Sequence, residues 1–152
     1  SIPNNPKLPL LFYPGVFGDV TPELIEETFH ANQWGNNWRA SVFPFPHYHA
    51  DAHEALGCFR GTATIRLGGV NGIEQTVQPG DAVVIPAGVG HENLGSSGDF
   101  TMVGAYPPGQ SPDLQRGEPS EREWVIESIA KVPLPVADPV FGVDGPLMKA
   151  WS

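Results

Sequence analysis

The region between residues 38 and 106 consists of short apolar segments separated by turns, and this pattern constrains the fold more than any other feature of the chain. The segments that favour strands are residues 38–43, 54–60, 62–67, 73–77, 82–85, 91–94 and 100–106. Glycine or proline stands at many of the breaks, in keeping with a composition of 18 glycines and 17 prolines. Strands this short, with turns at this spacing, predict an all-β barrel or sandwich rather than a fold of long helices.

The segment before the strands is predicted to hold an arm and one helix. Residues 1–18 form an extended apolar arm, and residues 21–32 form a helix that Thr21 caps and Pro22 begins. The apolar face of this helix is supplied by Leu24, Ile25, Thr28 and Phe29. We expect a single domain with an N-terminal arm and helix (1–34), a barrel core (35–106) and a C-terminal extension (107–152).

The C-terminal extension is predicted to hold a second helix and a wrapping tail. Ser120 and Glu123 have the spacing of a capping box for a helix that ends near Ala130. A proline-rich tail then runs to Trp151 and is too apolar to be disordered. This tail is expected to wrap either its own barrel or a partner subunit.

Two histidines one residue apart, His47 and His49, precede a glutamate, Glu54, and a third histidine, His91, follows a turn further along. In an extended chain, residues i and i+2 point to the same side, so His47 and His49 can direct two imidazoles at one point. Imidazole and carboxylate together suit divalent ions such as Fe, Mn, Ni, Co or Zn. Three histidines and one glutamate would leave coordination positions open for a ligand.

The arrangement of these residues resembles the cupin superfamily. The first cupin motif, His-x-His followed by Glu and Gly, is matched by His47, His49, Glu54 and Gly61. The second motif, Gly followed by Pro-x-Gly and His, is matched by Gly80, Pro86, Gly88 and His91. The resemblance implies a double-stranded β-helix, a jelly-roll-like barrel. It also implies that one divalent transition-metal ion (Fe, Mn, Ni or Zn) is held by His47, His49, Glu54 and His91.

The family contains several kinds of protein, so the resemblance leaves the function open. The leading hypothesis is a metal-dependent enzyme of dioxygenase, isomerase or decarboxylase type that acts on a small oxygen-bearing metabolite. The alternative is a small-molecule-binding or sensor cupin without turnover. A third possibility is a structural cupin whose metal site is vestigial.

Other residues near the two motifs have both a functional and a structural interpretation. Glu54, His53 and Arg60 are the catalytic candidates. His53 is predicted to point away from Glu54, either as a surface or outer-shell histidine or as a proton carrier at the mouth of the site. Arg60 either holds a substrate carboxylate or forms a surface salt bridge, and Cys58 is expected to fill the core.

The inward-facing positions of the predicted strands are mostly apolar, which suits a small and partly apolar ligand. These positions are Ala63, Ile65, Leu67, Val83 and Ile85. Tyr48, between the two histidines, should face outward and serve packing. Tyr106, Gln110 and Asp113 follow the last strand and either cover the site or simply belong to a turn.

Charge and composition exclude several partners. The 8 Lys and Arg residues against 17 Asp and Glu residues give a net charge of −9, which repels nucleic acid and anionic lipid. No apolar run is long enough to span a bilayer. The single cysteine, Cys58, fits a reducing compartment, so a cytoplasmic location is expected. The apolar arm and tail predict a homodimer, since one chain alone is not expected to bury the apolar surfaces of both segments.

Overall fold

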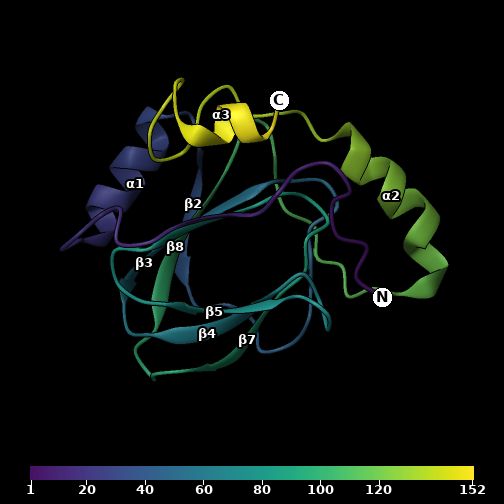
Figure 1. The fold of residues 1–152 in the computed structure, drawn as a ribbon, viewed down its shortest axis with the longest axis horizontal. Helices are drawn as coiled ribbons and strands as arrows, with labels where there is room; N and C mark the ends of the chain where they lie inside the picture. The colour runs from purple at the N-terminus through teal and green to yellow at the C-terminus, as the bar shows by residue number, and fades with distance from the viewer.

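The computed structural model describes residues 1–152 and consists mainly of two antiparallel sheets that enclose a barrel (Figure 1). The larger sheet has five strands in the order β1 (Leu11–Tyr13), β6 (Ala82–Ile85), β3 (Glu54–Arg60), β8 (Thr101–Tyr106) and β2 (Gly35–Ala40). The smaller sheet has the order β5 (Ile73–Val77), β4 (Ala63–Leu67) and β7 (His91–Ser96). This is the all-β double-stranded β-helix that the sequence predicted.

The barrel interior is an apolar cluster to which both sheets contribute. Leu56 and Cys58 of β3 face Ile65 and Leu67 of β4 across it, as strand alternation requires. Cys58 is fully buried and fills the core as predicted. Burial raises the pKa of its thiol to about 11, so the sulfur stays protonated and unreactive.

Two helices and the chain ends cover the outer face of the five-stranded sheet. Helix α1 (Pro22–Ala31) and helix α3 (Pro146–Ala150) lie over this sheet, as Figure 1 shows. Ile25 and Phe29 of α1 and Leu147 of α3 belong to one buried cluster with side chains of β3, β6 and β8. The sheet is therefore apolar on both faces, which explains why its strands show weak alternation in hydrophobicity.

Helix α1 forms close to where the sequence predicts it. The Thr21 side chain accepts a hydrogen bond from the Leu24 amide at 3.2 Å, and Pro22 occupies the first turn. Leu24 was predicted to belong to the apolar face, but it is 42% exposed. Of the four residues predicted to form the apolar face of α1, only Ile25 and Phe29 are buried. The face that α1 packs against the sheet is therefore narrower than the sequence pattern suggested.

Removal of the N-cap of α1 should lower stability modestly. We expect Thr21→Ala to reduce the free energy of unfolding by about 1 kcal/mol, because the Leu24 amide loses its acceptor. Urea denaturation followed by circular dichroism measures this difference. Thr21→Ser retains the hydroxyl and should behave like the parent protein; an equal loss in both variants would rule out the cap as the cause.

The second helix begins differently from the prediction. A 3₁₀ turn, η1 (Pro119–Glu121), leads into α2 (Arg122–Lys131), and no side chain caps either element. The predicted capping box is therefore wrong: Ser120 lies within the 3₁₀ turn and not at the helix boundary. Helix α2 is held by packing instead, since Val125 and Ile129 lie against Tyr48, Ala50 and Ala87. Tyr48 is buried there and serves packing, as expected.

Both chain ends pack on the barrel of their own chain. The arm contributes β1, whose residues pair with β6, and the tail contributes α3, which was not predicted. The indole of Trp151 is buried and donates to the Pro9 carbonyl at 2.8 Å, and the indole of Trp34 donates to the Ala137 carbonyl at 2.8 Å. The tail thus wraps its own barrel. The homodimer remains a prediction, with much of the apolar surface that motivated it already covered within one chain.

No helix in the structure combines the length and the apolar character needed to cross a membrane.

Candidate metal centre

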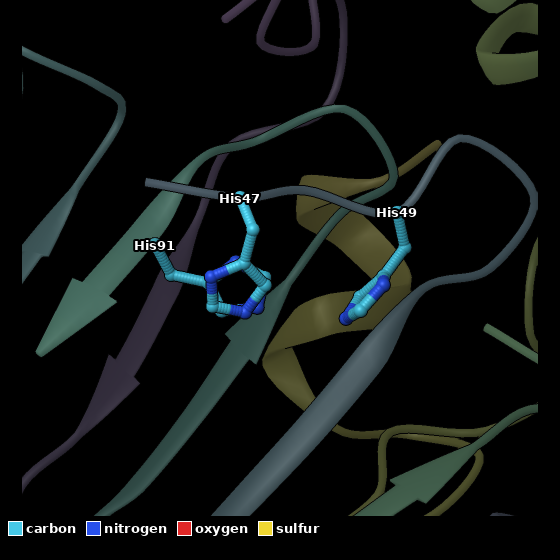
Figure 2. Close-up of side chains that lie close together, drawn as sticks. All are labelled: His47, His49 and His91. Atoms are coloured by element: carbon cyan, nitrogen blue, oxygen red, sulfur yellow. The ribbon is translucent and has the colours of Figure 1, made fainter. Parts of the chain in front are cut away.

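Three histidine side chains meet inside the barrel. His47 and His49 lie on an extended segment that makes isolated bridges, with His47 opposite His91 and Tyr48 opposite Gln115. His91 is the first residue of β7. The potential ligand atoms of His47, His49 and His91 all lie within 4.8 Å of one another, and the three rings point toward one another in Figure 2.

The backbone fixes the orientation of each imidazole. The Nδ1 atoms of His47, His49 and His91 lie 3.0, 2.6 and 3.2 Å from the carbonyl oxygens of Phe45, Asp113 and Val89. A carbonyl oxygen can only accept, so each Nδ1 carries a proton. The unprotonated nitrogen of each neutral ring is then Nε2. In such a tautomer Nε2 is the atom that can bind a metal.

Glu54 completes this cluster from the first position of β3. Glu54 is 3% exposed, and its carboxylate lies 3.5 Å from Nε2 of His49 and 3.3 Å from Nε2 of His91. Burial disfavours the ionised form, but contacts with His49 and His91 outweigh it and hold the pKa of Glu54 well below its usual range. A buried carboxylate therefore stays ionised beside three imidazoles.

The histidines respond to this environment in different ways. Burial, followed by repulsion from His91, lowers the pKa of His47 to about 4, so this ring is neutral at physiological pH. Burial also disfavours the charged form of His49. The Glu54 carboxylate and the Asp113 carbonyl outweigh it and raise the pKa of His49 to about 9. Both nitrogens of His49 face acceptors: Nδ1 faces the Asp113 carbonyl and Nε2 faces the Glu54 carboxylate. The surroundings of Nε2 therefore stabilise a positive charge.

A hydrogen-bonded chain of two further side chains also orients Glu54. The Tyr106 hydroxyl donates to Oε2 of Glu54 at 2.8 Å and accepts from Nε1 of Trp38 at 2.6 Å. Gly104 makes room for the indole, because a Cβ at this position would collide with the ring of Trp38. Burial, and then the Glu54 charge, raise the pKa of Tyr106, so its hydroxyl keeps the proton that it donates.

The cluster lies at the polar end of a cavity of about 430 Å³. Apolar side chains form most of its wall, among them Trp38, Val42 and Leu56. Phe43 and Leu114 also line it and are 50% and 49% exposed, so they stand at its mouth. The cavity is thus an apolar pocket with one concentrated polar site, as is typical of small-molecule sites.

His53 lies outside the cavity and is buried, contrary to the predictions of a surface or outer-shell histidine and of a proton carrier at the mouth. It points away from the Glu54 side of the sheet as predicted, but it is fully buried, with its ring centroid 4.8 Å from that of Trp151. Its Nδ1 accepts from the Ala87 amide at 2.9 Å, while Nε2 has no partner. Burial lowers the pKa of His53 to about 4, so the ring is neutral and structural. The tail that covers it could not be placed from sequence alone.

Arg60 also lies outside the cavity. Strand β3 shifts register against β8 between Cys58 and Arg60, and the side chain ends exposed at the strand terminus, without an ion pair. The predicted salt bridge is therefore absent, and Arg60 is not among the residues that line the cavity. Of the three catalytic candidates, the structure leaves only Glu54 at the site.

The end of β8 and the segment after it contribute to the cavity in part. Tyr106 and Asp113 line it, whereas the side chain of Gln110 turns away to accept from the His53 amide at 3.0 Å. Strand alternation could have placed Tyr106 on the inner face, because Met102 on the same face belongs to the barrel core. No sequence signal could have shown that the Asp113 carbonyl fixes His49, or that Trp38 supports Tyr106.

Comparison with known proteins agrees with this architecture. The profile of the family described as "Cupin domain" matches residues 40–104. An uncharacterized protein of Bacillus subtilis (strain 168), YjlB, is 45% identical over 150 residues, which cover 99% of this chain and 90% of that protein. The similarity therefore includes the arm, α2 and the tail as well as the barrel.

Several solved structures resemble the barrel at low sequence identity. The acireductone dioxygenase from Bacillus anthracis, with a cadmium ion in its active center, is 15% identical, with a TM-score of 0.47 over 68% of this chain and 82% of that one. A TDP-fucose-3,4-ketoisomerase from Campylobacter jejuni is 10% identical, with a TM-score of 0.46 over 62% and 73%. A DUF861 family protein from Thermotoga maritima is 19% identical, with a TM-score of 0.39 over 63% and 97%.

Proposed function

The chain belongs to the cupin superfamily, and from this we propose that it binds one divalent transition-metal ion and uses it to act on a small oxygen-bearing metabolite. His47, His49 and His91 would hold the ion through Nε2, and Glu54 would hold it through its carboxylate. The donor set of nitrogens and one oxygen suits Fe, Mn, Ni or Zn.

One observation carries this proposal: all three imidazoles are pinned at Nδ1 by backbone carbonyls, so that Nε2 is the nitrogen that each ring can offer to a metal. Histidines that merely fill a core have no need of a shared tautomer. Metal-binding histidines regularly have this second hydrogen bond, because it fixes the ring and raises the basicity of the ligating nitrogen. The buried Glu54 carboxylate beside them supplies the negative charge that a divalent cation needs.

The chemistry of such a site is electrophilic. When bound, a divalent ion with open coordination positions polarises a ligand oxygen. The protein would contribute a dry, apolar wall around that oxygen and a rigid Glu54 that Tyr106 holds in place. Dioxygenase, isomerase and decarboxylase reactions are the candidates, and the identity of the metal divides them.

Elemental analysis of protein purified without chelators or metal-binding tags tests the site. We expect one transition metal per chain, and we expect its removal by chelation to lower the melting temperature, since a ligand that binds only the folded state stabilises it. Iron would favour oxygen chemistry, while Mn, Ni or Zn would favour isomerase or lyase chemistry. A metal-free protein that gains no thermal stability from any of these ions would contradict the proposal.

Loss of the Tyr106 hydroxyl should weaken metal binding without abolishing it. In Tyr106→Phe, Glu54 loses the donor at Oε2 but keeps both histidine contacts. We expect metal affinity to fall by about 10-fold, the lower end of the effect of a residue that supports a ligand. Competition with a chromogenic chelator measures the affinity. Tyr48→Phe is the matched control, because the Tyr48 ring packs under α2 and its hydroxyl makes no contact with the site; an equal loss there would contradict the role of Tyr106.

A ligand-binding or sensor cupin without turnover is the second candidate, and the apolar cavity next to the cluster favours it to the same extent as an enzyme. The two differ in one measurable property. The metal-loaded protein would retain a ligand unchanged in the sensor case, whereas an enzyme would convert it. Mass spectrometry of the protein-bound and released small molecules, before and after incubation with oxygen, separates them.

A further inference from the structure

We infer that the ligand of this cavity is a small molecule with one oxygen-bearing head and an uncharged, apolar body, and not a phosphorylated, nucleotide-linked or polycarboxylate metabolite. The inference rests on the proposed metal site and narrows the class of molecule that the site accepts. It comes from the charge and polarity of the cavity wall.

The wall offers no cation for an anionic group away from the histidines. None of the 14 residues that line the cavity is Lys or Arg. A phosphate or a second carboxylate placed in the cavity would lose its hydration without an ionic partner, which is strongly unfavourable. Metabolites of these classes are usually held by arginine or lysine, because a charge-assisted hydrogen bond replaces the lost water.

The metal end does not supply excess positive charge either. Two acidic residues, Glu54 and Asp113, belong to the lining, and the Asp113 carboxylate accepts hydrogen bonds from the amides of Ala50 and Asp51. Their two negative charges offset the charge of a divalent ion, and imidazoles that bind the ion through Nε2 are neutral and add none. A ligand head that is neutral or singly ionised is tolerated there, whereas a multiply charged ligand meets no net attraction.

A cation close to the aromatic pair at the mouth, Arg116, is engaged by Phe45. Arg116 lies with its guanidinium carbon 3.9 Å above the centre of the Phe45 ring, and Arg116 does not line the cavity. Phe45 in turn stacks on Phe43, with ring centroids 5.0 Å apart. Of this aromatic pair, Phe43 lines the cavity, whereas the guanidinium lies over Phe45.

The mouth instead favours an apolar body. Phe43 and Leu114 line the cavity although about half of each side chain is exposed. Trp38 and Val42 continue this apolar surface inward toward the histidines. A cavity of about 430 Å³ accommodates a ring-sized body together with a small head group. Burial of such a body against these side chains provides the binding energy that the wall cannot provide by ionic contacts.

Calorimetric titration of the Zn²⁺-loaded full chain with three hydroxamates tests the inference. All three share a metal-chelating head: acetohydroxamate has no apolar body, benzohydroxamate has a phenyl body, and para-carboxybenzohydroxamate carries a charge on that body. We expect benzohydroxamate to bind at least about tenfold more tightly than acetohydroxamate, through burial of the ring. We expect the added carboxylate to remove this advantage.

Variants at the mouth identify the surface responsible. Phe43→Ala combined with Leu114→Ala should lower the affinity for benzohydroxamate to that for acetohydroxamate and leave acetohydroxamate binding unchanged. Val143→Ala is the matched control, because Val143 is 68% exposed and lies outside the cavity. It should change neither affinity.

The outcomes separate the two levels of the argument. Binding of acetohydroxamate without any preference for the phenyl body would leave the metal site standing and overturn the inference about the ligand. A preference for the carboxylated compound that disappears in Arg116→Ala would overturn it too, and would show that Arg116 reaches the mouth. Failure to load Zn²⁺ and to bind any hydroxamate would overturn the metal site itself, and the inference with it.

Discussion

Glu54→Gln should lower the affinity for the metal by more than about 100-fold, because it removes the charge of a direct ligand. Loss of a residue that only supports a ligand already lowers metal affinity by about 10- to 100-fold. The change preserves the size of the side chain, and Tyr106 can still donate to the remaining carbonyl oxygen. The three histidines would then face a neutral amide in place of a buried carboxylate. Metal content after dialysis against a weak chelator, and affinity by competition, give the measurement.

His91→Ala should have an effect of the same order, since it removes one of three convergent nitrogens. His30→Ala is the matched control: His30 is an exposed histidine at the end of α1, and its removal should leave metal binding unchanged. Unchanged affinity in both site variants, with a folded spectrum, would show that the ion binds elsewhere. Equal loss in all three variants would point to a general effect on folding.

Asp138→Ala should destabilise the protein by about 3 to 5 kcal/mol, a large fraction of the 5–15 kcal/mol typical of a domain. The Asp138 carboxylate is fully buried and accepts hydrogen bonds from the backbone amides of Val140, Phe141 and Leu147. It also accepts from the Tyr13 hydroxyl of β1. Alanine would leave the buried Leu147 amide and Tyr13 hydroxyl, and the partly buried amides of Val140 and Phe141, without this acceptor. Each unmade bond of a buried donor costs about 1–3 kcal/mol before the loop relaxes.

The contact joins the two ends of the chain, so its loss should release the tail from β1. Burial, and then the Asp138 carboxylate, raise the pKa of Tyr13, which therefore remains protonated and able to donate. Urea denaturation gives the change in free energy of unfolding, and Asp144→Ala is the control, since Asp144 is an exposed carboxylate of the same tail. We expect the control to stay within about 0.5 kcal/mol of the parent protein. A similarly small change in Asp138→Ala would show that the tail is held by apolar packing alone.

Local sequence was sufficient for the features that depend on the direction of neighbouring side chains. His47 and His49 face one point because alternate residues of an extended chain share a side, and Tyr48 between them packs under α2 for the same reason. The Thr21 cap forms because its hydroxyl needs only the amide of Leu24, three residues away. The short strands and their turns likewise gave the barrel class, since strand length and turn chemistry are local properties.

Tertiary structure alone decided the features that depend on contacts between distant segments. His53 is buried because Trp151 of the C-terminal tail packs against it. The two residues are far apart in the sequence, and no periodic pattern predicts a contact between them. The Glu54–Tyr106–Trp38 chain joins three different strands, and it forms only because a glycine at position 104 leaves space for the indole. The sequence by itself determined which side of its own strand each residue faces and which chemistry the histidines and Glu54 can support. The folded chain determined what covers each side, because burial and hydrogen-bond partners are set by segments that meet only after folding.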